Sequence, residues 1–196
     1  MIILNKDLLL RSLAENGYNV SFGARKNFAT YDIVEKMPGL ISLLGLMIGV
    51  LQIYARDFKY NDLISVILIL ASIIGLTISI YNSDKERYRE RGEELIQLHN
   101  QLRDLYYEVK SSNKPDFQDE LNRMNQIMNA FYSNNIPKQI SFSDWYAHYK
   151  FFYQTQHEWI DEQKKFTWKD KYPVSFRLFI LAIIVTVGVW LLNMYL

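Results

Sequence analysis

The pattern of hydrophobic and polar positions divides the chain into three long apolar stretches separated by polar segments. The apolar stretches cover residues 39–55, 63–81 and 174–196, and their only charged residue is Arg177. At about 1.5 Å of rise per residue, the shortest would form a helix of roughly 26 Å, close to the ~30 Å hydrocarbon core of a bilayer. Twelve Leu, Ile and Val residues in the second stretch favour its insertion by about 4 to 7 kcal/mol. We therefore predict three transmembrane helices.

The polar segment before the first span predicts two short helices. Asn5 is a suitable N-cap for a helix over residues 5–16, and Gly17 is a typical stop signal. A second helix is expected over residues 24–36, ending before Pro38, because proline is suited to the first turn of the following span. Residues 1–36 would thus form an N-terminal helical region ahead of a transmembrane hairpin over residues 37–81.

After the second span, no proline occurs before Pro115, so we expect that span to continue as one helix to about Lys110. Within it, apolar residues recur at alternating three- and four-residue spacing, the pattern of a coiled-coil seam. These residues are Leu95, Leu98, Leu102, Leu105 and Val109. Such a seam can hold together either an oligomer or a bundle within one chain, and the residues are candidates for both.

Residues 115–173 predict two further helices. A turn at Pro115 precedes an amphipathic helix over residues 117–131, and after a loop Ser143 is expected to cap a long helix that leads to Pro173. Residues 82–173 would then form an antiparallel helical bundle, followed by a third span over residues 174–196. The predicted fold class is an all-α integral membrane protein: N-terminal helices, a transmembrane hairpin, a cytoplasmic bundle with a coiled-coil-like seam, and a C-terminal transmembrane helix.

The basic residues indicate how the spans are oriented. The hairpin loop holds only Arg56 and Lys59, whereas residues 82–173 hold fourteen Lys and Arg residues, several of them directly beside the second and third spans. The positive-inside rule therefore places the N-terminus and residues 82–173 in the cytoplasm. The hairpin loop and Leu196 would lie on the opposite, outer side of the membrane.

Small and polar residues gather on one face of each of the first two spans. The first span contributes Ser42, Gly45, Gly49 and Gln52, and the second contributes Ser65, Ser72, Gly75 and Ser79. Small residues at this spacing let helices approach closely, so these faces are candidates for helix contact within the hairpin. Alternatively they line a pore in an oligomer. The two interpretations are compatible if one face packs and the other borders a lumen.

Composition argues against several other classes of function. A net charge of +1 does not favour direct binding of nucleic acid. The chain has no cysteine and only three histidines, without metal-site spacing, so no metal or other cofactor is expected. No ionisable residue lies in the middle of a span, where ion-coupled transport needs one. Phosphate-binding loops and nucleophile motifs are also missing, so we do not expect an enzyme.

Aromatic residues crowd residues 145–168 and admit two interpretations. They could stack on the bases of a nucleotide, with Lys150 nearby. The plainer interpretation is a core stripe that packs against the leucine seam, made of Trp145, Tyr149, Phe152 and Trp159.

Three segments resemble the SLATT family of bacterial two-span membrane proteins. They are ARKNFATYDIVEKMPG before the tight hairpin, SDKERYRERGEELIQLHNQLRDLYYEV after it, and NNIPKQISFSDWYAHYKF, which together lie within about residues 20–155. Because the third span departs from the two-span plan, the chain resembles a longer subfamily.

The resemblance implies an effector that acts on the host membrane. Members are found beside nucleotide-signalling genes, so the implied partner is a nucleotidyltransferase or a reverse transcriptase encoded in the same operon. The leading hypothesis is a homo-oligomeric, pore-forming effector of antiviral abortive infection, embedded in the lipid of a bacterial inner membrane with its hairpin loop and Leu196 on the periplasmic side. The alternative is a non-conducting membrane scaffold that anchors a cytoplasmic partner enzyme.

Overall fold

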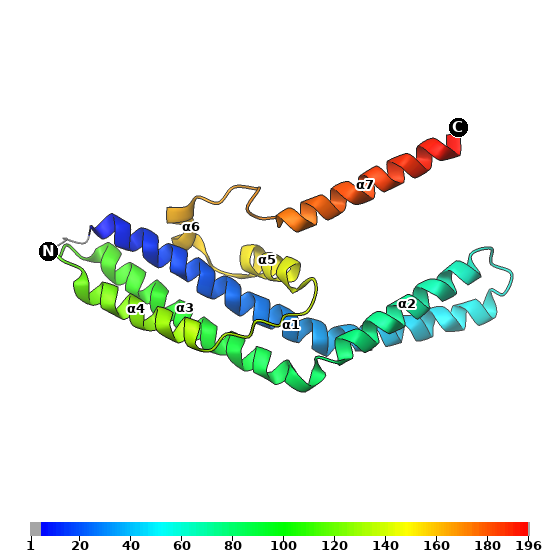
Figure 1. Cartoon of the computed structure of the whole chain (residues 1–196), viewed down its shortest axis with the longest axis horizontal. Coiled ribbons are helices and arrows are strands. Elements are labelled where there is room, and N and C mark those ends of the chain that lie inside the picture. Colours follow the sequence, from blue (N-terminus) through cyan, green and yellow to red (C-terminus); the bar gives the residue numbers. More distant parts are fainter. Residues whose placement is uncertain (1–4, 196) are drawn as a thin grey trace.

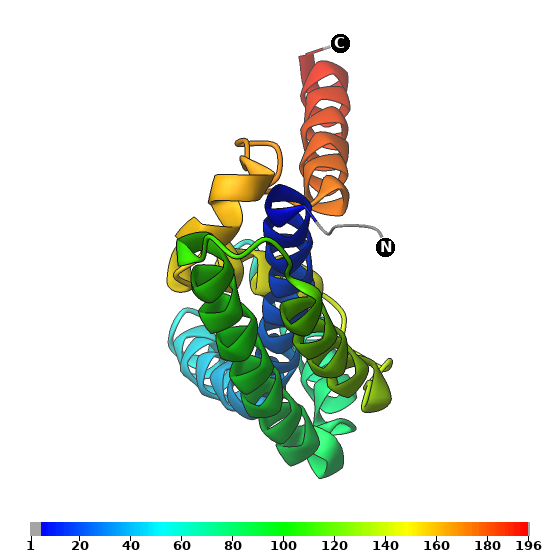
Figure 2. The same cartoon turned by 90° about the vertical axis from the view of Figure 1, so that its left-hand side faces the viewer.

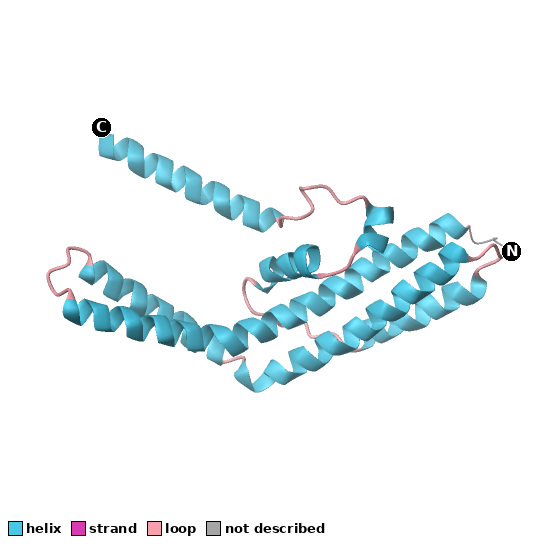
Figure 3. Ribbon diagram, turned by 180° about the vertical axis from the view of Figure 1, so that it is seen from behind, coloured by secondary structure: helices cyan, strands magenta, loops and turns pink. Residues whose placement is uncertain are grey.

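The computed structural model describes residues 5–195, and the side chains of residues 5–192. Within these residues the chain forms helices and loops and no strand (Figures 1 and 3). The elements are α1 (Lys6–Tyr54), α2 (Asn61–Ser79), the 3-10 turn η1 (Asn82–Asp84), α3 (Lys85–Ser111), α4 (Gln118–Ser133), α5 (Ser143–Gln154), α6 (Glu158–Lys164) and α7 (Val174–Tyr195). Three helical segments are long and apolar enough to cross a membrane. The predicted fold class is thereby confirmed.

The N-terminal region is one helix rather than two. Asn5 caps it as predicted, since its side chain accepts a hydrogen bond from the Asp7 N–H at 3.0 Å. The predicted stop at Gly17 is wrong, because α1 continues without interruption for 49 residues, roughly 73 Å. A side chain at Gly17 would place its Cβ 2.2 Å from the Trp159 ring. Glycine is present at this position because α6 approaches the backbone closely.

Pro38 also fails to end a helix and lies inside α1. Proline removes one hydrogen bond from the helix and crowds the carbonyl one turn earlier. Both sides of this position are held in place by packing: Val34 is buried against Ile78 and Ile140 on the bundle side, and Ile41 contacts Gly75 of α2 on the other. Tertiary contacts therefore carry the helix across a position that local preference would break.

The second span does not continue into the bundle as one straight helix. α2 ends at Ser79, and η1 at Asn82–Asp84 changes the direction of the chain before α3 begins at Lys85 (Figure 1). The sequence here is Asn-Ser-Asp, three residues whose side chains compete with helical hydrogen bonding and favour caps and turns. This local turn signal ends the helix although no proline is present, so the prediction of one continuous helix to Lys110 is wrong.

The predicted long helix after Ser143 is two short helices. Phe142, in a left-handed conformation with φ of 68°, is the N-cap of α5, and Ser143 is the first helical residue without a capping side-chain bond. Between α5 and α6, Thr155 is extended and its hydroxyl donates to the Lys150 carbonyl at 2.9 Å. Lys165, with φ of 52°, ends α6.

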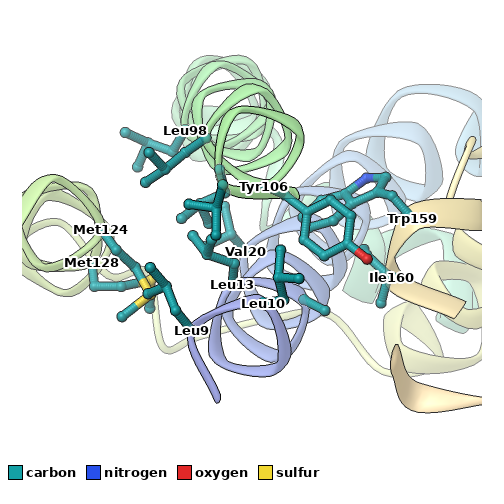
Figure 4. Packing of buried hydrophobic residues seen from close by; sticks show 14 of the residues in the cluster. Leu9, Leu10, Leu13, Val20, Leu98, Tyr106, Met124, Met128, Trp159 and Ile160 are labelled. Atoms are coloured by element: carbon teal, nitrogen blue, oxygen red, sulfur yellow. The ribbon is translucent and has the colours of Figure 1, made fainter. Parts of the chain in front are cut away.

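The hydrophobic core lies between the first part of α1 and helices α3 to α6. α1, α3 and α4 run side by side (Figure 2). Leu9 of α1 lies beside Met124 and Met128 of α4, and Tyr106 of α3 lies beside Trp159 of α6 (Figure 4). The bundle thus includes α1 in addition to the predicted cytoplasmic helices.

The aromatic residues of α5 and α6 divide between core and surface. Phe152 and Trp159 are buried, as the core-stripe interpretation predicts. Tyr149 is half exposed, so it does not belong to that stripe. Phe151, whose side chain is fully buried, takes its place against Tyr18 of α1.

The hairpin of α1 and α2 and the helix α7 project from the same end of the bundle (Figure 1). The apolar windows of α1 and α7 have no buried residue. α7 is joined to the bundle near its first turn, where the Trp145 indole N–H donates to the Ser175 hydroxyl at 3.0 Å and packs against Phe176 and Phe179. Leu196, which the predicted topology assigns to the side opposite the bundle, lies outside the described residues.

Candidate functional site in the membrane hairpin

The loop end of the hairpin is fixed by side-chain hydrogen bonds. The Gln52 amide donates to the Asn61 carbonyl at 2.9 Å and to the Ser65 hydroxyl at 3.1 Å. The Asn61 side chain donates in turn to the carbonyls of Ala55 and Arg56. Two of the eight predicted contact residues, Gln52 and Ser65, therefore join α1 to α2 where the chain reverses.

The other serines of the two predicted faces bond to their own helices. The hydroxyls of Ser42, Ser72 and Ser79 donate to the carbonyls four residues earlier, at distances of 2.8 to 3.0 Å. A hydroxyl satisfied in this way can face hydrocarbon at little cost. The serine faces are therefore compatible with lipid or with another helix.

Five of the eight predicted residues border one groove between α1 and α2. They are Ser42, Gly45, Ser72, Gly75 and Ser79, around a space of about 740 Å³. At Gly75 the two helices pack together, since a Cβ there would lie 3.7 Å from the Ile41 side chain. The tertiary structure thus brings parts of both predicted faces together along the hairpin.

Gly45 and Gly49 remain uncovered within one chain. A Cβ at either position would have no heavy atom of another element within 4 Å. The space beside both glycines is therefore open, including the part of the groove that Gly45 borders. Their spacing is nevertheless that of a helix-contact motif. This surface is available to another molecule in the membrane.

The leucine seam of α3 lies inside the bundle. Leu102, Leu105 and Val109 are fully buried, and Leu95 and Leu98 are at most 8% exposed. Their neighbours in the core cluster include Leu13, Val20 and Met128 of the same chain. One chain is therefore sufficient to bury these five residues.

Ion pairs connect the bundle to α1 just before its apolar part. The Asp32 carboxylate accepts hydrogen bonds from Lys36 and from Lys150 of α5, both at 2.6 Å. Burial raises the pKa of Asp32, but the bonds from the two lysines outweigh that effect and hold its pKa below the ordinary value. The Asp32–Lys36 spacing was visible in the sequence, whereas the partner from α5 was not.

One histidine lies inside the bundle. His99 is buried with its Nδ1 3.2 Å from the Gly17 carbonyl, and burial lowers its pKa to about 4. In the part of the chain that the structure describes, no group of three or more His, Asp or Glu side chains is placed to hold a metal ion.

The fold and the hairpin together define a helical membrane protein whose first two spans emerge from a helical bundle. Residues 4–180 match the family model described as SMODS and SLOG-associating 2TM effector domain 6, and the chain belongs to this family. The resemblance to the SLATT family is thus confirmed, and the protein is a membrane effector of that family. Most of α7 lies beyond the matched residues. No curated protein and no solved structure matches the chain.

Proposed function

We propose that several copies of this chain assemble through their hairpins into a pore in the bacterial inner membrane. The observation that carries the proposal is the uncovered Gly45 and Gly49 surface. Glycines four residues apart let two helix backbones approach closely, and in lipid such contacts replace the hydrophobic effect as the source of association. Because two helices cannot enclose a channel by themselves, conduction requires several hairpins.

The direction of the signal follows from the predicted topology. With basic residues flanking the bundle at both membrane ends, the bundle lies in the cytoplasm and Leu196 in the periplasm. The bundle would then receive the signal from a cytoplasmic partner, in accord with a family name that includes association with SMODS and SLOG. That partner would be a nucleotidyltransferase or a reverse transcriptase from the same operon. Depolarisation of the infected cell would make the protein an abortive-infection effector rather than an enzyme.

The test compares two glycines in the apolar helices. Gly49→Leu fills the uncovered surface of α1, whereas Gly188→Leu makes the same change in α7, where a Cβ also meets nothing within 4 Å. At both positions the added Cβ meets no other part of the same chain. On overexpression, a potential-sensitive dye should report depolarisation by the wild type and by Gly188→Leu, and a largely preserved potential with Gly49→Leu.

A different observation favours the scaffold alternative. Since the hydroxyls of Ser42, Ser72 and Ser79 donate their protons to their own helices, these serines do not require water beside them. A scaffold would arrest growth, if at all, with an intact membrane potential, and its effect would depend on a partner enzyme bound to the bundle. Arrest without depolarisation by the wild type would therefore contradict the pore and support the scaffold.

A further inference from the structure

A second groove lies where the bundle meets the hairpin. It encloses about 890 Å³ between the middle of α1, the end of α2 and the segment that leads into α5. None of the residues singled out in the sequence for helix contact or for the seam borders it. The groove is therefore separate from the glycine surface proposed for pore assembly.

The lining of this groove changes from apolar to polar along its length. Its hairpin end is formed by Met37, Leu40 and Ile74, which belong to the parts of α1 and α2 that are apolar enough to lie in a membrane. Its bundle end is formed by polar and aromatic side chains, among them Asp32 and Tyr146. A molecule bound in the groove should therefore be amphipathic, with its hydrocarbon part at the hairpin end and its polar part at the bundle end.

The polar end carries a positive balance. Lys36 borders the groove, Lys150 lies over the ring of Tyr146 at 4.6 Å, and Lys138 lies over the ring of Tyr81 at 4.8 Å. Asp32 is the carboxylate of the lining, and it already accepts bonds from Lys36 and Lys150. Lys150 and Lys138 flank the lining, and the flanking carboxylates Glu35 and Asp144 are already paired with Lys85 and Lys26. With those pairs neutral, the three ammonium groups around Asp32 leave two positive charges for an anionic headgroup.

We propose that this groove binds one anionic phospholipid from the leaflet on the bundle side. Leu40 and Ile74 at the hairpin end of the groove are about half exposed, so an acyl chain can reach the groove without leaving the hydrocarbon. Lysines at the level of the headgroups attract anionic lipid, and tyrosine and tryptophan side chains are favoured at the same depth. A bound lipid would contact α1, α2 and the start of α5 together and so couple the bundle to the hairpin.

The test measures lipid binding by the full-length protein in mild detergent, using native mass spectrometry. Palmitoyl-oleoyl phosphatidylglycerol and palmitoyl-oleoyl phosphatidylcholine serve as probes because their acyl chains are identical. We expect the first phosphatidylglycerol to bind about tenfold more tightly than phosphatidylcholine. The double variant Lys36→Gln with Lys138→Gln should abolish most of that preference. Lys169→Gln, a lysine near α7 that does not border the groove, should retain it.

A second pair of variants tests the apolar end. Ile74→Trp fills the groove and should weaken phosphatidylglycerol binding about tenfold, whereas Leu70→Trp, one turn earlier on α2 and outside the lining, should not. Equal affinity for the two lipids in the wild type, or unchanged affinity in Ile74→Trp, would overturn the proposal. A third result would also overturn it: if the groove variants lost the mass of any oligomer seen for the wild type while lipid binding stayed unchanged, the groove would belong to an interface with a second copy. The proposal does not depend on pore formation.

Discussion

The two parts of α1 belong to one helix but lie in different surroundings. Twelve residues between Leu9 and Val34 are buried, whereas none from residue 35 to Tyr54 is. The more hydrophobic part is nevertheless the exposed one. It is uncharged from Gly39 onward, whereas the buried part contains Lys, Arg, Asp and Glu. Hydrophobicity therefore does not indicate whether protein or lipid covers a residue.

The two parts of α1 differ in sequence because side chains inside the bundle and side chains in lipid have different hydrogen-bond partners. In the bundle, polar residues are acceptable because they find partners: the Thr30 hydroxyl donates to the Gln139 side chain at 2.5 Å, and Asn27 bonds to the Gly23 carbonyl at 2.9 Å. A side chain that faces lipid finds no such partner beyond its own helix, so nearly every lipid-facing residue must be apolar. In the bundle part, a residue is accepted if its side chain packs and finds hydrogen-bond partners. In the membrane part, it is accepted if it is apolar.

The largest expected difference between the two parts comes from removing a leucine. Leu13 is fully buried in the bundle, and Leu46 is 70% exposed on the hairpin. Leu13→Ala should lower the free energy of unfolding by about 3 kcal/mol, because a cavity remains in the core. Leu46→Ala should change it by less than about 0.5 kcal/mol. Denaturant unfolding in detergent, followed by circular dichroism, gives both values, and similar losses would contradict the comparison.

Acid should weaken the bundle part of α1 selectively. Burial lowers the pKa of His99, which faces the Gly17 carbonyl, to about 4 from its ordinary 6.5. Between these two values the unfolded chain binds a proton that the folded chain does not, so stability falls as the pH falls through this window. From pH 7 to pH 5 the loss should be about 2 kcal/mol.

His99→Gln provides the control for the acid effect, because glutamine can still donate to the Gly17 carbonyl but does not titrate. Most of the pH dependence above pH 5 should disappear in this variant. A remainder is expected from His148, whose pKa burial also lowers. If wild type and His99→Gln lose the same stability on acidification, His99 is not the group responsible.

The smallest expected effect concerns two glycines of the same helix. Gly17→Ala would place a Cβ 2.2 Å from the Trp159 ring, whereas Gly45→Ala meets nothing within 4 Å. Overpacking at Gly17 costs about 1 to 3 kcal/mol and is partly offset by the better helix propensity of alanine, about 1 kcal/mol. A net loss of about 1 kcal/mol is expected for Gly17→Ala. Gly45→Ala should be neutral or slightly stabilising, as measured by thermal unfolding of the two variants.

Much of the architecture could be predicted because its signals are local. Uncharged stretches of membrane length gave the candidate spans, and the spacing of Leu95 to Val109 identified a face of α3 that is in fact buried. Asn5 was recognisable as a cap because its side chain bonds to a backbone group only two residues away. At the candidate site, the faces of small and polar residues on the first two spans could be recognised from residue type and spacing alone.

Element boundaries were harder to predict, because nearby and distant residues compete there. Gly17 and Pro38 are local stop signals, yet Trp159, Val34 and Ile78 pack around these positions and the helix continues. The opposite occurs at Asn82–Asp84, where a turn signal prevails in a stretch without proline.

By itself, the sequence determined the helical class, the three apolar segments and the residues that could form close contacts, because each depends on composition or on spacing along one helix. Only the tertiary structure decided which contacts exist. Gly75 meets Ile41 within the hairpin while Gly45 and Gly49 face open space. The leucine seam of α3 packs against other helices of the same chain. The physical reason is that helix packing depends on the relative position of two surfaces, which no single segment encodes.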